Sequence, residues 1–230
     1  MSTPFTPDPD ALAPPDLLAG EALLPPPQQE RSRAKRAALL AAALVLFGER
    51  GYEATTTATI AERAGIAVGG FYLHFVSKRQ LLLVLMAQLL DEATRVAPPP
   101  PAIGGTIATM ISAMVRQALQ LDWAFAGAYR AWREAALQDA ALATLNRAIE
   151  RWSAAQLAHL VQPFATLPGA RADVDVPSVA SALSVLILRL AETPLHDPAE
   201  VERIVATLTH MILHTFFHDE YAAPGEQSAG

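Results

Sequence analysis

Residues 55–82 read TTTATIAERAGIAVGGFYLHFVSKRQLL, and this stretch decides the fold. Its first half has apolar residues at the spacing of one helix face, namely Ile60, Ala61 and Ala64. Thr55 or Thr56 can cap the start of that helix, and Gly65 can end it. The pattern predicts a short helix followed by a glycine turn.

A second, very short helix is expected after the turn. Its inward-facing residues are Ile66, Phe71 and Phe75. Its more open face comprises Val68, Gly69, Gly70, Tyr72 and His74. Each glycine should destabilise a helix interior by about 1 kcal/mol relative to alanine. Their presence indicates that something large approaches the backbone, and the groove of a DNA duplex would require that room.

An earlier helix completes the arrangement. An apolar stripe of Leu40, Leu44 and Phe47 predicts a helix that ends near Gly51. The chain would then have three helices, of which the last two form a helix-turn-helix.

These residues resemble the DNA-binding domain of TetR-type transcriptional regulators. The resemblance covers residues 33 to about 85. It rests on the run Phe47-Gly-Glu-Arg-Gly-Tyr52, then Thr55, Ile60-Ala61, Ala64-Gly65-Ile66, Gly69, Tyr72, His74-Phe75 and Lys78. It implies an all-α fold, with an N-terminal three-helix helix-turn-helix domain and a C-terminal helical bundle for ligand binding and dimerisation.

The resemblance also implies roles for single residues. Tyr72, His74 and Lys78 match positions that contact or approach DNA phosphates, and Thr56 and Thr57 begin the preceding helix, where hydroxyls and free amides suit phosphate oxygens. Without the resemblance, Tyr72 could equally be a packing aromatic and Lys78 a solvated surface charge.

The sequence departs from the family pattern where bases would be contacted. Ala58 stands where a long side chain is usual, and Ala67 replaces the usual Ser or Thr. Few side chains beside Val68 can form the bidentate pairs that discriminate guanine or adenine. We therefore expect recognition through thymine methyl groups, through Thr57 or Thr59, and through DNA shape.

Positive charge is concentrated in the part of the chain that contains the predicted DNA-binding helices. Net charge is −5 over residues 1–30, +4 over 31–97 and −5 over 98–230, which gives −6 for the chain. Four basic residues stand ahead of the first predicted helix: Arg31, Arg33, Lys35 and Arg36. We interpret them as an arm that reaches phosphate or the minor groove; a solvated basic face is the alternative.

Composition limits the other classes of function. The 230 residues are 52% hydrophobic and show no strand-like alternation, which favours an all-helical protein. The absence of cysteine excludes disulfides and thiolate metal sites and suits a reducing, cytoplasmic compartment. No apolar run is long enough to cross a membrane. No GxSxG, phosphate-binding glycine loop or paired carboxylates indicate an enzyme, and no cofactor is expected.

The sequence predicts five regions. Residues 1–30 form a disordered extension rich in proline and acids, 31–77 the helix-turn-helix domain, 78–97 a connecting helix capped by Ser77, 98–220 the effector-binding and dimerisation domain, and 221–230 a disordered tail. Helices in the fourth region are expected at 104–120, 123–138, 140–161, 177–192 and 198–218.

The middle helices carry candidates for an apolar or aromatic effector site. They are Trp123, Phe125, Tyr129, Trp132, Arg133, Trp152 and His159. Ordinary core packing is the alternative for the aromatic members.

The last two helices carry aliphatic stripes that suit a twofold interface. The predicted interface residues are Leu183, Leu186, Ile187, Leu190, Ile204, Leu208 and Met211, with internal packing as the alternative. The resemblance implies a homodimer whose recognition helices lie about 34–36 Å apart, matching a palindromic operator in double-stranded DNA.

Histidines 210, 214 and 218 share one face of the last helix at the spacing of a zinc site. Lacking a partnering Glu or Cys, they are interpreted as a polar stripe beside the dimer face, and no metal is expected.

The sequence therefore favours a dimeric repressor released from its operator by a small molecule. The alternative is a helix-turn-helix protein that binds DNA without an effector and has an architectural role.

Overall fold

The computed structural model describes residues 12–25, 27–96, 106–191 and 197–218. The elements in these ranges are helices, with one isolated β-bridge between Ala170 and Phe217. The all-α fold expected from the sequence is confirmed. No helix of the described residues is long and apolar enough to cross a membrane.

The described residues form two compact units. The N-terminal unit comprises Pro14–Glu92 and Leu121–Ile149, and the C-terminal unit comprises the described parts of Met1–Ala13, Ala93–Gln120 and Glu150–Gly230. Three of the boundaries fall within helices. Residues 121–149, which the sequence places in the predicted 98–220 region, cluster with the helix-turn-helix residues.

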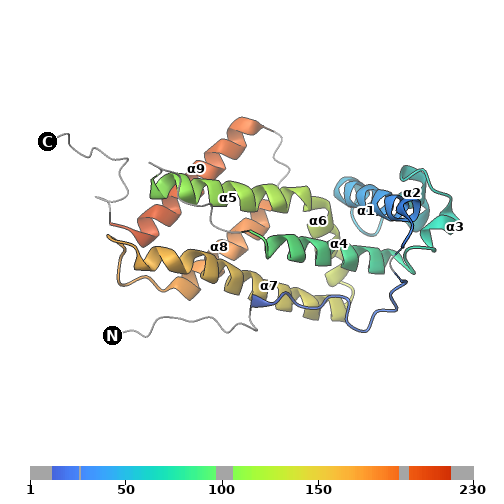
Figure 1. The fold of residues 1–230 in the computed structure, drawn as a ribbon, viewed down its shortest axis with the longest axis horizontal. Coiled ribbons are helices and arrows are strands. Elements are labelled where there is room, and N and C mark those ends of the chain that lie inside the picture. The colour runs from blue at the N-terminus through green and yellow to red at the C-terminus, as the bar shows by residue number, and fades with distance from the viewer. Residues whose placement is uncertain (1–11, 26, 97–105, 192–196, 219–230) are drawn as a thin grey trace. The chain divides into compact units, whose positions relative to one another are not determined.

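Figure 1 shows the helices in chain order. Those mainly in the N-terminal unit are α1 (Glu30–Arg50), α2 (Thr57–Arg63), α3 (Val68–Phe71), α4 (Lys78–Ala93) and α6 (Ala126–Ala136). Those wholly or partly in the C-terminal unit are α5 (Ile107–Ala124), α7 (Ala140–Val161), the 3₁₀ turn η2 (Gln162–Thr166), α8 (Val176–Ala191) and α9 (Pro198–Phe216).

Most helix bounds agree with the sequence patterns. α7 spans the predicted residues, and α8 and α9 differ from prediction by at most two residues at either end. The break before α6 was expected at residues 121–122 but lies at Phe125. No glycine or proline interrupts the chain before Phe125, so α5 continues to Ala124.

The three N-terminal helices pack around aromatic side chains. Phe47, Phe71 and Phe75 are fully buried, as is Ile60 of α2. Thr55 is also buried, and its hydroxyl donates to the carbonyl oxygen of Gly51 at 2.7 Å. That bond satisfies a carbonyl at the end of α1 and holds the connection to α2.

Helix α6 crosses α1 at two glycines. A Cβ added to Gly127 would overlap the carbonyl oxygen of Leu44 and lie 2.9 Å from the amide nitrogen of Gly48. Only a residue without a side chain permits this approach. The sequence pattern identified Gly48 as part of a family motif but gave no sign that Gly127 is its partner.

Polar contacts from α6 reinforce this crossing. The Glu134 carboxylate accepts bonds from the amides of Tyr52 at 2.6 Å and Glu53 at 3.1 Å. The Arg130 guanidinium donates to the carbonyl oxygen of Gly48 at 2.6 Å. Side chains of α6 therefore satisfy backbone groups at and after the C-terminal end of α1.

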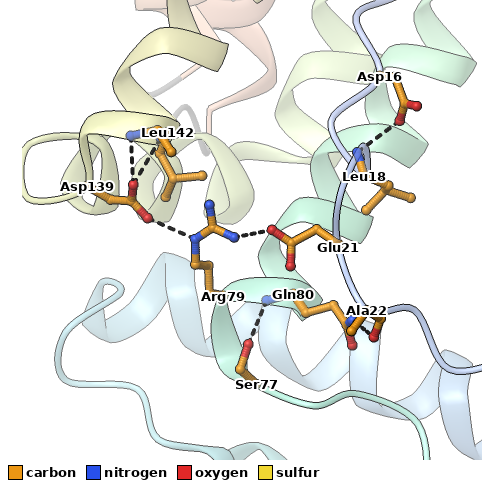
Figure 2. Close-up of polar contacts among 10 residues, drawn as sticks. Asp16, Leu18, Glu21, Ala22, Ser77, Arg79, Gln80, Asp139 and Leu142 are labelled. Carbon is orange, nitrogen blue, oxygen red and sulfur yellow. Dashed lines mark hydrogen bonds and ion pairs between the residues drawn. The ribbon is translucent and has the colours of Figure 1, made fainter.

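The segment before α1 packs on the protein, which corrects the expectation of a disordered extension for its described part. Leu17 is buried, Glu21 forms an ion pair with Arg79, and the Gln80 side chain donates to the carbonyl oxygen of Ala22 at 2.9 Å. Figure 2 shows these contacts. The sequence of this segment shows no helical or strand periodicity, which is why it was expected to be disordered. Burial of Leu17 and the polar contacts of residues 21–22 with α4 hold it in place. Residues 1–11 lie outside the described residues.

Arg79 joins this segment to the start of α7. Its Nε donates to Asp139 at 2.8 Å, and the Asp139 carboxylate also accepts from the amides of Ala141 and Leu142 at the first turn of α7 (Figure 2). Hydrogen bonding to Arg79 lowers the pKa of Asp139. One guanidinium thus links α4, α7 and the N-terminal segment within a single unit.

In the C-terminal unit, the end of α9 returns to the turn that follows η2. Phe164 and Phe216 meet edge to face at 5.9 Å, and the amide of Arg171 donates to the carbonyl oxygen of Phe216 at 2.8 Å. Arg116 of α5 pairs with Glu202 of α9. These contacts fix α9 against its own unit.

Candidate functional site

A reciprocal capping box begins α2. The Thr56 hydroxyl accepts from the Thr59 amide at 3.1 Å, and the Thr59 hydroxyl accepts from the Thr56 amide at 3.0 Å. Of the two predicted caps, Thr56 is therefore the one used. The Thr59 hydroxyl also donates its only proton to the Thr56 carbonyl at 2.9 Å, which leaves it no proton to donate to a base.

Gly65 forms the turn between the two helices in the expected way. It has φ +67°, a left-handed conformation that favours glycine, and the Ile66 amide donates to the Ala61 carbonyl at 2.9 Å. The turn fixes where α3 begins. Ala67 occupies the N-cap of α3 without a side-chain cap, in agreement with the unusual residue noted there.

The two glycines of α3 have different surroundings. A Cβ on Gly69 would meet no atom within 4 Å, whereas one on Gly70 would lie 2.6 Å from Cγ2 of Ile66. Gly69 therefore fits the expectation of an open backbone. Gly70 is explained by internal packing, because Ile66 is β-branched and cannot easily move its methyl group away.

Tyr72 links α3 to the start of α2. Its hydroxyl lies 3.1 Å from that of Thr57, and its ring meets the buried Phe71 edge to face at 5.3 Å. The Tyr72 side chain remains 51% exposed. The pair brings a hydroxyl from α2 and a hydroxyl from the residue after α3 to one exposed position, which is a suitable geometry for a shared phosphate oxygen.

Two exposed apolar residues beside this position were missed by the sequence reasoning. Leu73 is 77% exposed and Val76 is 46% exposed, on the chain just after α3 and close in sequence to the exposed Val68. The sequence predicts that the second helix is very short. Because α3 ends at Phe71, residues 72–76 lie beyond it and do not share a helical face.

The same shortness corrects the prediction for His74. The sequence pattern predicts an open-face position for His74, but its side chain is only 8% exposed. Because α3 ends at Phe71, position 74 does not share that face. Burial, followed by the charges of Arg36 and Lys35, lowers the pKa of His74, so its imidazole is neutral at pH 7.

Lys78 is directed at Tyr52. Its ammonium donates to the Tyr52 carbonyl at 2.6 Å and lies 4.0 Å from the centre of the Tyr52 ring. Burial is the main cause of its lowered pKa. These contacts engage the charge within the protein, and a phosphate contact by Lys78 stays a prediction.

The four basic residues are helical, which corrects their interpretation as an arm ahead of the first helix. All lie in the first two turns of α1, which begins at Glu30. Arg31 and Lys35 are exposed, and Arg33 pairs with Glu30 at 2.7 Å. Arg36 is half-buried, with its guanidinium 4.6 Å from the centre of the Phe75 ring. The acid at the first turn and the apolar stripe that follows explain why the helix starts this early.

The predicted effector residues are divided between the two units. Trp123, Phe125, Tyr129, Trp132 and Arg133 belong to the N-terminal unit, whereas Trp152 and His159 belong to the C-terminal unit. Arg133 and His159 are exposed. The indole of Trp132 donates to Asn146 at 3.0 Å, and that of Trp152 donates to the Leu12 carbonyl at 3.1 Å, so both indole N–H groups have internal partners.

Tyr129 forms a buried polar pair with Asp122, a residue that the sequence reasoning did not select. The Tyr129 hydroxyl donates to the Asp122 carboxylate at 3.0 Å. Burial raises the pKa of Asp122 to about 7 against the stabilising effect of this bond, and burial likewise raises that of Tyr129. No sequence pattern marks Asp122, because its property arises from burial.

The predicted interface residues are only partly available in a single chain. Leu183 and Leu208 are buried, whereas Leu186, Ile187, Leu190 and Ile204 are half-buried. Met211 is 46% exposed, and Val185, absent from the predicted set, is 62% exposed. The exposed part of the α8 and α9 surface thus contains some of the expected residues and one unexpected one.

Two histidines of α9 are in ring contact. The ring centroids of His210 and His214 lie 4.0 Å apart with the ring planes tilted by 52°. Among the described residues, no three His, Cys, Asp or Glu side chains are arranged to hold a metal ion.

Comparison with known proteins supports the helix-turn-helix assignment. Residues 39–85 match the family described as bacterial regulatory proteins, tetR family. The HTH-type transcriptional repressor KstR2 of Mycobacterium tuberculosis strain H37Rv is 45% identical over 49 residues, which are 21% of this chain and 24% of that protein. An uncharacterised HTH-type regulator of Bacillus subtilis, YerO, is 55% identical over 38 residues, 16% of this chain and 13% of that protein. The chain thus matches at most about a quarter of the length of these curated relatives.

Solved structures extend the likeness to the whole fold. The ketosteroid transcriptional regulator KstR2 of Mycobacterium tuberculosis has a TM-score of 0.60 at 16% identity, covering 80% of this chain and 96% of that one. A SmeT-triclosan complex has a TM-score of 0.58 at 20% identity, covering 86% and 98%. At these identities the likeness establishes the fold.

Proposed function

We propose that the chain is a transcriptional regulator of the TetR type, a dimeric repressor that binds a palindromic DNA operator and is released by a small apolar or aromatic effector. The observation that carries this proposal is the exposed surface around α3. We call it the α3 surface and define it by Thr57, Val68, Gly69, Tyr72 and Leu73.

The α3 surface suits the major groove of DNA. Gly69 offers backbone that no neighbouring atom covers, and Val68 and Leu73 project apolar groups that can contact thymine methyls. The Thr57–Tyr72 hydroxyl pair can bind a phosphate. Because Thr59 is committed to the capping box, Thr57 is the hydroxyl better suited to direct contacts.

The exposed cations of α1 supply attraction that does not depend on sequence. Arg31 and Lys35 lie one turn apart on α1 and are both exposed, and neither forms an ion pair within the described residues. Neutralising phosphates releases counterions and produces a strong dependence on salt. Specificity must then come from the α3 surface and from DNA shape.

Two observations support an effector and a dimer. One solved structure of the same fold is a SmeT-triclosan complex, and another is the ketosteroid transcriptional regulator KstR2. The exposed Val185 and Met211 on α8 and α9 are apolar groups that an interface between two copies would cover. The contacts of α6 with α1 offer a physical link by which a change beside α6 alters the reader.

The proposal is tested by selecting bound duplexes from a random DNA pool with the full chain at near-physiological salt. We expect an inverted repeat whose half-sites lie about 10 base pairs apart or a multiple of that spacing. Light scattering on the same preparation should give twice the mass of one chain. Enrichment of no sequence, or a strictly monomeric protein that binds a single half-site, would contradict the dimeric repressor.

An effector-independent DNA-binding protein with an architectural role is the second candidate. It is favoured by the lack of long polar side chains at Ala58 and Ala67. The two differ in linkage: an effector lowers operator affinity only if it binds the two conformations differently. Release of the selected duplex by an apolar aromatic compound supports the repressor, and a set of such compounds that bind the protein without affecting DNA affinity supports the architectural role.

A further inference from the structure

A groove open to solvent lies along α4 in the N-terminal unit. Its volume is about 540 Å³, within the range of sites that bind small molecules. One wall is formed by Leu18, Leu23 and Leu24 of the N-terminal segment, and another by Val84 and Ala87 of α4. None of these residues belongs to the α3 surface or to the predicted effector set.

One end of the groove is positively charged. Arg36 and His74 line it beside Gln80. The Arg36 guanidinium stacks on Phe75 and, within the described part of the chain, has no hydrogen-bond or carboxylate partner. A half-buried guanidinium in this position can still offer its planar set of N–H donors to an anion.

The neighbouring polar groups leave that role to Arg36. The Gln80 side chain accepts from the Val76 amide at 2.9 Å and donates to the Ala22 carbonyl at 2.9 Å, so its amide serves the protein. His74 is buried beside Arg36, and burial is the main cause of its lowered pKa, which leaves it neutral at pH 7 and able to donate one hydrogen bond.

The other end of the groove is acidic. Asp91 lines it eleven residues beyond Gln80 on the same helix, which corresponds to about 16 Å along the axis. Between the two ends the walls are mainly aliphatic. The groove therefore has a cationic end, an apolar middle and a far end lined by a carboxyl group.

We propose that this groove binds a small anionic amphiphile, a medium-chain carboxylic acid, with the carboxylate on Arg36 and the hydrocarbon chain between Val84, Ala87 and the leucines of the N-terminal segment. A guanidinium binds a carboxylate through two parallel hydrogen bonds. The site differs from the effector site of the proposed function in both location and charge requirement.

Isothermal titration calorimetry of the full chain with decanoate, without DNA, tests the site. We expect one equivalent to bind, and Arg36→Gln to weaken binding about tenfold because a charged hydrogen-bond donor is lost. Ala87→Phe should reduce binding by filling the groove. Decan-1-ol and decyltrimethylammonium, which share the tail, should bind at least about tenfold more weakly. Arg50→Gln is the control: it removes an exposed charge from α1, the helix that carries Arg36, at a position outside the groove. Decanoate binding should be unchanged.

Two results would overturn the site: no binding of decanoate, or equal affinity in wild type, Arg36→Gln and Ala87→Phe. If Ala87→Phe fails to fold, Gln88→Trp obstructs the groove from an exposed position and provides the same test. Because the assay contains no DNA, its outcome is independent of whether the chain represses transcription.

Discussion

At the scale of the residue, Asp122 is a carboxylic acid held in the interior of the N-terminal unit. Burial raises its pKa from 3.8 to about 7, so the folded protein keeps a proton that the unfolded chain releases. Folded-state stability therefore falls as pH rises from about 4 to about 7. The size of this loss is at most about 4 kcal/mol.

Asp122→Asn should remove this loss while keeping an acceptor for Tyr129. The free energy of unfolding in urea, measured across that pH range, should show the variant gaining on wild type as pH rises. Glu62→Gln, at an exposed carboxylate on α2, should give a difference from wild type that does not change with pH in this way. Parallel pH profiles for wild type and Asp122→Asn would contradict the raised pKa.

Glycine is expected at positions 127 and 69 for different reasons: close helix packing at Gly127 and an open backbone at Gly69. Gly127→Ala places a methyl group against the Leu44 carbonyl, and overpacking of this kind costs about 1–3 kcal/mol, more than the gain of about 1 kcal/mol in helix propensity. Thermal unfolding should occur several degrees lower than in wild type. Gly69→Ala meets no atom, so its unfolding temperature should be unchanged or higher while its affinity for the selected duplex falls. A Gly127→Ala protein as stable as wild type would rule out the close crossing.

At the scale of the element, Glu134 holds the end of α1 to α6. Its carboxylate accepts from two backbone amides, and hydrogen bonds to a charged group contribute about 1.5–3 kcal/mol. Glu134→Ala should lower the free energy of unfolding by that order, as measured in urea, and Glu134→Gln by less. Glu62→Ala, which removes an exposed carboxylate, should have little effect. If the two alanine variants are equally stable, the contact does not stabilise the crossing.

The contribution of Arg31 and Lys35 on α1 to DNA binding is tested by the dependence of affinity on salt concentration. Arg31→Gln with Lys35→Gln should reduce the slope of log affinity against log salt by about 2, provided that each side chain neutralises one phosphate. Fluorescence anisotropy on the selected duplex at several salt concentrations gives the slope. Replacing Arg50 and Arg147, which are exposed but not part of this surface, is the control. An unchanged slope in the Arg31 and Lys35 variant would mean that these cations do not contact DNA.

The helices were predictable where pattern and local capping agree. Thr56, Gly65 and Ser77 act as signals within a few residues of the helix ends that they determine, and the bounds follow them. His74 was misplaced because its position depends on where a four-residue helix ends, and its side chain is buried there. Gly127, Asp122 and the groove beside α4 depend on contacts across long stretches of chain, for which one sequence carries no signal.

At the scale of the whole molecule, segments far apart in the sequence cluster into one unit. Proline and glycine at residues 98–105 suggested a boundary, but residues 121–149 group with the helix-turn-helix. The close α1–α6 crossing and the Arg79–Asp139 ion pair explain that grouping. The reader therefore has direct contacts with helices that the sequence assigned to the effector domain.

The proposed function requires the α3 surface to recognise DNA sequence. The most direct measurement compares the dissociation constants of the full chain for the selected duplex and for a scrambled duplex of equal composition, at fixed near-physiological salt. The chain should bind the selected duplex about 10³-fold or more tightly than the scrambled one. Val68→Ala should reduce that preference about tenfold while changing the affinity for the scrambled duplex little. Equal affinity for the two duplexes, or a preference that Val68→Ala leaves intact, would contradict the claim.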